Sequence, residues 1–269
     1  IYFHLKPESV GHPNIYLGSK VSKAKLTNGV ECWCNSSCQY VKEAIKNTES
    51  YIQKHNGKML KSKTKSPMET NYRPELDVTP VLNPIEANYY QSQIGVLRWC
   101  VELGRIDITT EVSMLLSHNA LPRVGHLDAV FRIFSYLKTK TNARLVLDPT
   151  YADIDYESFP KENWCEFYGN AKEHLPPNAP APRGKPVEVR CYVDADHAGD
   201  QLMRRSRSGI VILLNSAPTM WYSKKQNTVE TSTFGSEFVA LKIAAETLRG
   251  LRYKLRMMGV PIAGPSYVY

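Results

Sequence analysis

Apolar residues recur at helical spacing in several stretches of the first 140 residues. One helix is predicted from Ser36 to about Lys54, because a Ser-x-x-Gln capping box precedes a single apolar stripe. A second begins at Asn83-Pro84, and further helices are expected over about Ile108 to Ser117 and Gly125 to Lys138. Their expected buried positions are Tyr40, Val41, Ala44, Ile45, Thr48, Tyr51, Ile52, Tyr90, Ile94, Leu97, Val101, Leu127, Val130, Phe131, Phe134 and Leu137.

Short strand patterns flank this helical region. Near the start, Ile15 to Leu17 and Val30 to Cys34 are predicted strands, and Asn28-Gly29 indicates a hairpin. Residues 175–186, "LPPNAPAPRGKP", are rich in proline and show neither the helical nor the strand spacing of apolar residues. They are interpreted as a linker and domain boundary.

After the linker the pattern changes to strands followed by one helix. Strands are predicted over Val187 to Val193, Ser208 to Leu214 and Thr219 to Gln226, and another begins at Tyr267. The helix should run from about Gly235 to Arg256. Its expected buried residues are Phe238, Leu241, Ala245, Leu248 and Leu251. The pattern as a whole predicts an α+β fold.

The composition is that of a globular protein with a basic excess. Hydrophobic residues make up 42% and charged residues 22%, and Lys+Arg 34 against Asp+Glu 26 gives a net charge of +8. This charge suits a polyanion-binding surface, although many basic proteins bind no polyanion.

The longest apolar run, Ile210 to Leu214, is too short to span a membrane, and no secretory signal is recognised. An intracellular reducing environment is expected because the six cysteines lack the density of a disulfide scaffold. The chain opens at Ile1 and closes on a strand-like pattern, so we expect it to be part of a longer protein.

Six cysteines are too dispersed for a disulfide scaffold. Cys32 and Cys34 would share one strand face, with Cys38 close by. A zinc site would require a fourth ligand, so buried or free thiols are the alternative interpretation.

The stretch "VRCYVDADHAGD", Val189 to Asp200, contains three carboxylates after a predicted strand. Asp194 would end that strand, and Glu237 would lie in the first turn of the following helix. Two such carboxylates can share a divalent ion, and two ions can support phosphodiester cleavage. Alternatively, Asp194 closes a turn and Glu237 only favours the helix N-terminus.

The last region resembles the ribonuclease H domain of copia-type retrotransposon polyproteins. The resemblance rests on four motifs of this chain: Tyr192-Val193-Asp194-Ala195-Asp196-His197-Ala198-Gly199-Asp200, Arg204-Arg205-Ser206-Arg207-Ser208-Gly209, Trp221-Tyr222-Ser223-Lys224-Lys225-Gln226 and Glu237-Phe238-Val239-Ala240. The middle of the chain is similar to the same polyproteins through Ile94-Gly95-Val96-Leu97, Arg105-Ile106-Asp107-Ile108 and Tyr136-Leu137-Lys138, where His126 is expected to be structural.

The resemblance implies four parts. Residues 1–75 would be the end of the palm and the thumb of a reverse transcriptase, and 76–174 a helical connection region. After the linker at 175–186, residues 187–269 would be a C-terminally truncated ribonuclease H-like domain, a mixed sheet with one long helix. The parent would copy RNA to DNA and cleave the RNA of RNA–DNA hybrids by two-metal hydrolysis, in the cytoplasm (in virus-like particles) or the nucleus.

The resemblance also implies the site and its partners. Asp194 and Glu237 would be the catalytic metal ligands, with Mg²⁺ or Mn²⁺ as cofactor, and no small-molecule cofactor or membrane is expected. Nucleic-acid contacts would come from Arg204, Arg205, Arg207, Lys224 and Lys225, and the partners would be an RNA–DNA hybrid or other nucleic acid and the remainder of the polyprotein. Only two of the family's four carboxylates match, so this chain is expected to be inactive alone. The alternative is a catalytically silent nucleic-acid-binding remnant, decayed or retained by a host.

Overall fold

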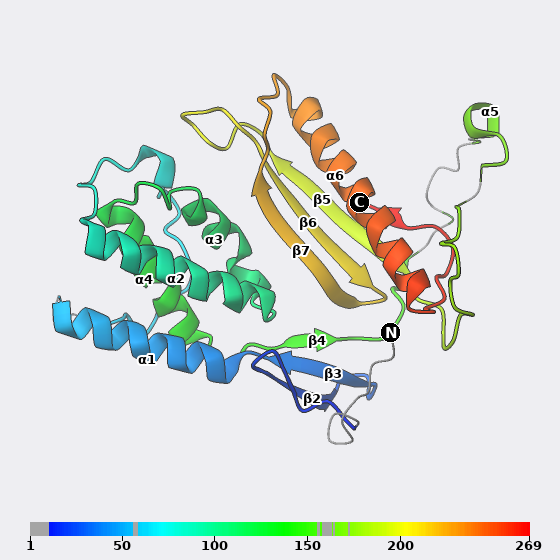
Figure 1. Ribbon diagram of the computed structural model, residues 1–269, viewed down its shortest axis with the longest axis horizontal. Coiled ribbons are helices and arrows are strands. Elements are labelled where there is room, and N and C mark those ends of the chain that lie inside the picture. The colour runs from blue at the N-terminus through cyan, green and yellow to red at the C-terminus, as the bar shows by residue number, and fades with distance from the viewer. Residues whose placement is uncertain (1–10, 56–58, 155–156, 158–162, 164, 172) are drawn as a thin grey trace.

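The computed structural model describes residues 11–55, 59–154, 157, 163, 165–171 and 173–269. The structure has two four-stranded sheets and a helical region, and Figure 1 shows most of the helical region at the left of the view with both sheets to its right. Helices and strands alternate irregularly along the chain, and the predicted α+β class is confirmed as a mixed α and β architecture.

The first sheet is antiparallel and has the order β1-β2-β3-β4. Its strands are β1 (Ile15–Tyr16), β2 (Ser19–Lys25), β3 (Glu31–Ser36) and β4 (Leu145–Leu147). The predicted hairpin joins β2 to β3. Gly29 adopts a φ of +81°, and the Asn28 side chain accepts a hydrogen bond of 3.0 Å from the amide of Val30. Strand β4 was not predicted, because it is only three residues long and pairs with β3 from far along the chain.

Helices α1 (Cys38–His55), α2 (Pro84–Glu102) and α4 (Val124–Thr139) share one hydrophobic core. The predicted buried positions on these helices are confirmed, except that Tyr40, Tyr51 and Phe131 are only partly buried. Helix α2 begins as expected. Asn83 accepts from the amide of Glu86 at 3.0 Å, and the Glu86 side chain accepts from the amide of Asn83 at 3.3 Å. The predicted capping box of Ser36 and Gln39 is wrong: Ser36 ends strand β3, α1 begins at Cys38, and the Gln39 side chain donates to Glu43 at 2.8 Å.

Two short helices complete the middle region. The 3-10 helix η3 (Ile106–Ile108) leads into α3 (Thr109–Leu116), which packs against the second sheet. Arg105, at the start of η3, is buried and forms a bidentate ion pair with Asp107, with a shortest distance of 2.7 Å. His126 is buried at the start of α4, where its ring bonds the amide of Arg123 and the carbonyl of Pro74. Its predicted structural role is confirmed.

The second sheet has the order β7-β6-β5-β8. Strands β5 (Val189–Asp196), β6 (Arg207–Leu214) and β7 (Ala217–Lys225) form an antiparallel meander. Helix α6 (Thr233–Met257) then returns across one face, and β8 (Tyr267–Val268) joins parallel to β5. The chain therefore forms three antiparallel strands, a long helix and a parallel edge strand.

The buried face of α6 differs from the predicted one. Leu248 and Leu251 are buried as expected, whereas Phe238 is 60% exposed, Leu241 is 42% exposed and Ala245 is also exposed. The residues that face the sheet include Ala240 and Ala244. The helix has two apolar stripes, and its small residues allow closer approach to the strands. Periodicity alone could not decide between the two stripes.

Residues 173–187 contain the predicted linker and lie against the end of α6. Glu173 pairs with Arg252 at 2.7 Å and with Arg256 at 2.6 Å, and the amide of Arg183 bonds the carbonyl of Gly259. These hydrogen bonds hold the pKa of the Glu173 carboxyl down at about 2. Residues 175–186 have no helix or strand, as predicted, yet they are fixed to the second sheet's helix. None of the helices within the described residues is long and apolar enough to cross a membrane.

Candidate functional site

A hydrogen-bond network brings the end of β5 and the start of α6 to one end of the second sheet. The buried amide nitrogen of Gln226 donates to the Ser208 hydroxyl at 3.0 Å and to the carbonyl of Ser236 at 2.9 Å. Ser208 is the cross-strand partner of Ala195, the residue between Asp194 and Asp196. Ser236 directly precedes Glu237. The network therefore places both predicted carboxylates at the same end of the sheet.

The side chains of Asp194 and Glu237 lie on different faces of the second sheet. On β5, Val189 and Cys191 belong to the core beneath α6, so the alternation of a strand turns Asp194 to the opposite face. Glu237 lies on α6 itself. Both side chains are exposed, and within the described part of the chain no hydrogen bond or ion pair engages either carboxylate. Their oxygen atoms are thus open to solvent and available as ligands.

Asp196 and Asp200 shape the loop that follows β5. A side chain at Gly199 would place its Cβ 1.9 Å from Oδ2 of Asp196, so glycine leaves the room that this carboxylate occupies. Asp200 accepts hydrogen bonds from the amides of Leu202 and Met203 and pairs with Lys225 at 2.6 Å. These contacts are those of loop-forming residues.

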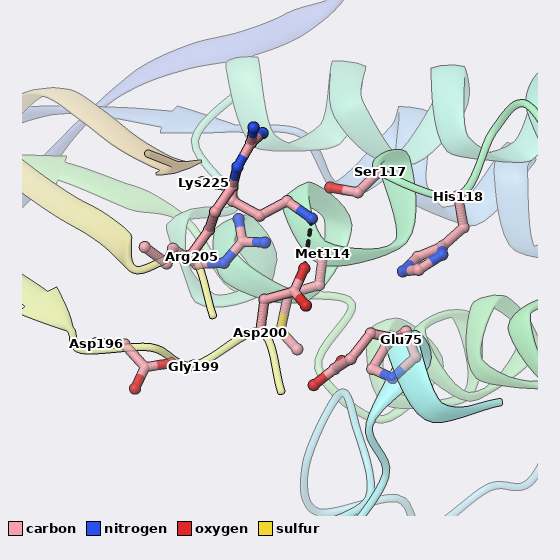
Figure 2. Close-up of a pocket in the computed structure, with 11 residues that line it drawn as sticks. Glu75, Met114, Ser117, His118, Asp196, Gly199, Asp200, Arg205 and Lys225 are labelled. Atoms are coloured by element: carbon pink, nitrogen blue, oxygen red, sulfur yellow. Dashed lines mark hydrogen bonds and ion pairs between the residues drawn. The ribbon is translucent and has the colours of Figure 1, made fainter. Parts of the chain in front are cut away.

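The five basic residues predicted to bind nucleic acid have different surroundings. Arg204 and Lys224 are exposed, and Arg205 is partly buried. Lys225 is neutralised by Asp200, as the dashed line in Figure 2 shows. Arg207 donates to the Ser113 hydroxyl at 2.6 Å and points into the contact with α3. Only Arg204 and Lys224 therefore present an unobstructed cation to a polyanion.

A small cavity of about 30 Å³ lies where the helical region meets the second sheet (Figure 2). Its lining includes Glu75, His118, Asp200 and Lys225, and the amide of Gln201 donates to Glu75 across the junction at 3.2 Å. Burial, followed by the nearby charges of other cationic groups, lowers the pKa of His118 to about 4. His118 is therefore neutral at pH 7.

A larger recess of about 330 Å³ lies beside Asp194. Two cross-strand rows form its floor on the sheet face opposite α6. One row is Tyr192, Val211 and Trp221, and the adjacent row is Asp194, Gly209 and Ser223. Thr109 and Thr110 of α3 and Tyr269 form its walls. This set, named here the aromatic recess, was missed in the sequence, although the alternation of strand residues does place each row on one face.

The donor chemistry of the site fits a magnesium ion but provides few ligands. Carboxylate oxygens are the ligands that Mg²⁺ prefers, and Mg²⁺ commonly uses one or two carboxylates together with waters. Across the described residues, no group of three or more His, Cys, Asp or Glu side chains is arranged to hold a metal. All six cysteines are free, and burial raises the pKa of Cys191 to about 11, so that thiol stays protonated at pH 7.

Comparisons with known proteins give similarity at the level of 24–29% identity. Secreted RxLR effector protein 161 of Plasmopara viticola is 26% identical over 62% of this chain and 94% of its own length. A putative transposon Ty5-1 protein of Saccharomyces cerevisiae is 29% identical over 60% of the chain and 41% of its length. The retrovirus-related Pol polyprotein from transposon RE1 of Arabidopsis thaliana is 24% identical over 71% of the chain.

No family model matches the chain, and no solved structure matches it. The chain spans 41% of the Ty5-1 relative and 10% of the RE1 polyprotein, so it corresponds to a limited part of these longer proteins. The chain is therefore similar both to parts of retrotransposon proteins and to a secreted effector.

Proposed function

We propose that this chain is a segment of a copia-type reverse transcriptase–ribonuclease H, and that its second sheet belongs to a nuclease acting on the RNA of RNA–DNA hybrids. The observation that carries the proposal is the arrangement of the second sheet. Its strands have the order β7-β6-β5-β8, with α6 inserted before the parallel strand β8, and Asp194 and Glu237 lie at one end of it. The resemblance to ribonuclease H domains implies a mixed sheet with one long helix, and this arrangement of strands and helix supports the proposal.

In this proposal Asp194 and Glu237 are each metal ligands, because both are exposed carboxylates without another partner among the described residues. Since they lie on different faces of the sheet, each would hold its ion together with waters and not together with the other carboxylate. A divalent ion bound there would supply charge stabilisation for phosphodiester hydrolysis. Asp200 holds Lys225 and the loop backbone, so it is assigned to the support of the site. Arg204 and Lys224 are the basic residues best exposed to contact a phosphate backbone.

The test is a titration of the full chain with Mn²⁺, in which the electron paramagnetic resonance signal of the free ion is measured at each step. Asp194→Asn and Glu237→Gln should each weaken Mn²⁺ binding at least tenfold. Glu246→Gln is the matched control, because Glu246 is an exposed carboxylate on the same helix that contacts only Lys242 at 3.8 Å. Equal Mn²⁺ affinity in the wild type and in Asp194→Asn would rule out the assigned site.

A second candidate is a nucleic-acid-binding protein without catalysis. The match covers 94% of the length of a relative that is named a secreted effector. That relative is therefore not named as a polymerase or a nuclease, although nearly all of it resembles this chain. A fluorescence anisotropy titration with a labelled RNA–DNA hybrid separates the candidates. Hybrid binding that is indifferent to Mg²⁺ and to Asp194→Asn favours the binding protein, whereas binding that Mg²⁺ strengthens in the wild type alone favours the nuclease.

A further inference from the structure

The aromatic recess has a built floor with two chemically distinct halves. Tyr192, Val211 and Trp221 give one half an apolar and aromatic surface, and these three residues are aligned across β5, β6 and β7. Trp221 is held in place because its indole N–H donates to the carbonyl of Val101 at 3.2 Å. Tyr192 is 44% exposed and stacks with Tyr269 at a ring distance of 5.2 Å, so a flat aromatic surface is accessible from solvent.

The second half is polar and partly empty. Gly209 lies between Asp194 and Ser223 in the next row, and a Cβ at this position would meet nothing within 4 Å. The absent side chain therefore leaves space in the middle of the floor. At the wall, the buried hydroxyl oxygen of Thr109 has no hydrogen-bond partner among the described residues. Buried polar atoms without partners are uncommon, and because this oxygen has almost no accessible surface, a ligand would bond it only after the Thr109 side chain rotates toward the recess.

We propose that the aromatic recess binds a nucleobase of a single-stranded stretch of nucleic acid, presented next to Asp194. This inference rests on the proposed function and adds a contact next to the same site with a nucleotide that lies outside the paired hybrid. Bases stack on accessible aromatic side chains because every base has a π face. The cavity of about 330 Å³ lies at the low end of the range for small-ligand sites. The net charge of +8 belongs to the whole chain, whereas Asp194 is the one charged side chain among the described residues that line the recess, so the recess suits the uncharged base and not the phosphate of a strand.

The polar half also predicts which bases bind best. A carboxylate accepts hydrogen bonds from exocyclic amino groups, as Asp and Glu do from the amino group of cytosine. Asp194 would therefore favour adenine, cytosine and guanine, which carry an amino group, over uracil, which carries none. The hydroxyl groups of Thr109 and Ser223 can donate to or accept from the remaining ring atoms.

Neutral nucleosides test the base contact without the phosphate and without a metal. The full chain, in the presence of a chelator, is titrated with adenosine, cytidine, guanosine and uridine, and the tryptophan fluorescence is followed. Stacking near Trp221 should quench its emission, and Trp221→Phe identifies which part of the signal comes from this residue among the four tryptophans. Uridine should bind several-fold more weakly than the other three, and Asp194→Asn should remove that difference.

Gly209→Leu is the main blocking variant. It fills the floor of the recess at a strand position where the glycine φ is not positive and the new Cβ meets no atom. Nucleoside binding should weaken at least tenfold, with the circular dichroism spectrum and the thermal midpoint showing that the sheet is intact. Gly250→Leu is the matched control, because Gly250 on α6 also has open space around its Cβ. Its binding should equal that of the wild type.

Tyr192→Ala provides a second test if Gly209→Leu fails to fold, and Tyr253→Ala is its control on an exposed part of α6. Unchanged nucleoside affinity in both Gly209→Leu and Tyr192→Ala would overturn the proposal, as would the absence of any nucleoside-dependent quenching in the wild type.

Quenching by tetramethylammonium but not by nucleosides would also overturn it and would indicate a cation site instead. Mn²⁺ binding without nucleoside binding would refute the recess alone, and nucleoside binding without Mn²⁺ binding would refute the metal site alone.

Discussion

Arg207 on β6 donates a hydrogen bond of 2.6 Å to the hydroxyl of Ser113 on α3. The Ser113 hydroxyl in turn donates to the carbonyl of Ser223 on β7 at 2.6 Å. A residue of the Arg-Arg-Ser-x-Ser motif therefore ties the helical region to the second sheet. Trp221 adds a second connection through its bond to Val101.

Ser113→Ala should lower the free energy of unfolding by about 1–2 kcal/mol, because it removes one hydrogen bond to a charged donor and one to a carbonyl. Urea unfolding followed by tryptophan fluorescence measures the change. Ser117→Ala is the control, because Ser117 is exposed on the same stretch and bonds only the Ser113 carbonyl. Equal stability of the two variants would show that the junction does not depend on this contact.

Gln226→Leu should destabilise the start of α6 by roughly 1–3 kcal/mol. The buried Ser208 hydroxyl and Ser236 carbonyl would both lose their donor, and leucine has a similar volume but cannot replace the bonds. Hydrogen exchange of the first turns of α6 is the direct measurement, with Gln201→Leu in the exposed loop as the control. Unaltered protection of these amides would contradict the assigned role of Gln226.

Gly104→Ala and Gly95→Ala should change stability in opposite directions, although both substitutions lie at or near α2. Gly104 has a φ of +103°, and a Cβ there would come within 3.1 Å of the Leu145 side chain, so alanine should cost about 1–3 kcal/mol. Gly95 lies inside the helix with nothing within 4 Å of its Cβ, so alanine should add up to about 1 kcal/mol. Thermal unfolding of both variants checks the pair, and a stabilised Gly104→Ala would disprove the strain.

Acidification from pH 7 toward pH 5 should weaken the fold through His118. Its pKa is about 4 in the folded chain and about 6.5 when unfolded, so the unfolded state binds the proton first as the pH falls. Above about pH 6.5 His118 costs the folded state nothing. The free energy of unfolding falls as the pH drops toward 4, and at pH 5 the loss is on the order of 1–2 kcal/mol. His118→Gln should flatten the pH dependence of the unfolding free energy in this window.

His55→Gln is the control for that experiment, because His55 is exposed at the end of α1. A slope that persists in His118→Gln would assign the pH dependence to another group at the junction. Asp200 does not complicate this window, because the ammonium of Lys225 and backbone amides hold the pKa of its carboxyl below its ordinary value.

Short sequence motifs predicted several helix starts and turns. These predictions were right where the contacts that form the structure lie within the motif itself. Asn83 and Glu86 form the expected capping box, and Asn28-Gly29 forms the expected hairpin, because the contacts lie within a few residues. The α6 face was predicted incorrectly because Phe238 and Ala240 both belong to apolar stripes. Which stripe is buried depends on how closely the helix approaches the sheet, and the sequence does not specify that distance.

The candidate site shows the same division. The motifs led to Asp194 and Glu237, and the Gln226 network places them at one end of the sheet. The basic residues could not be resolved from the sequence, because the exposure of a cation depends on long-range neighbours. Lys225 meets Asp200, and Arg207 meets Ser113, a residue 94 positions away. The binding roles of all five basic residues stay predictions.

The pairing of β3 with β4 has a consequence for synthesis on the ribosome. Until residues 145–147 emerge, Trp33 and its neighbours on β3 have unsatisfied backbone groups along one side, although α1 can already form. An open strand edge of this kind invites pairing with other chains. Nascent chains ending between α1 and α4 should therefore be the most prone to aggregate or to recruit a chaperone, and the three residues of β4 protect that edge once translation has passed them.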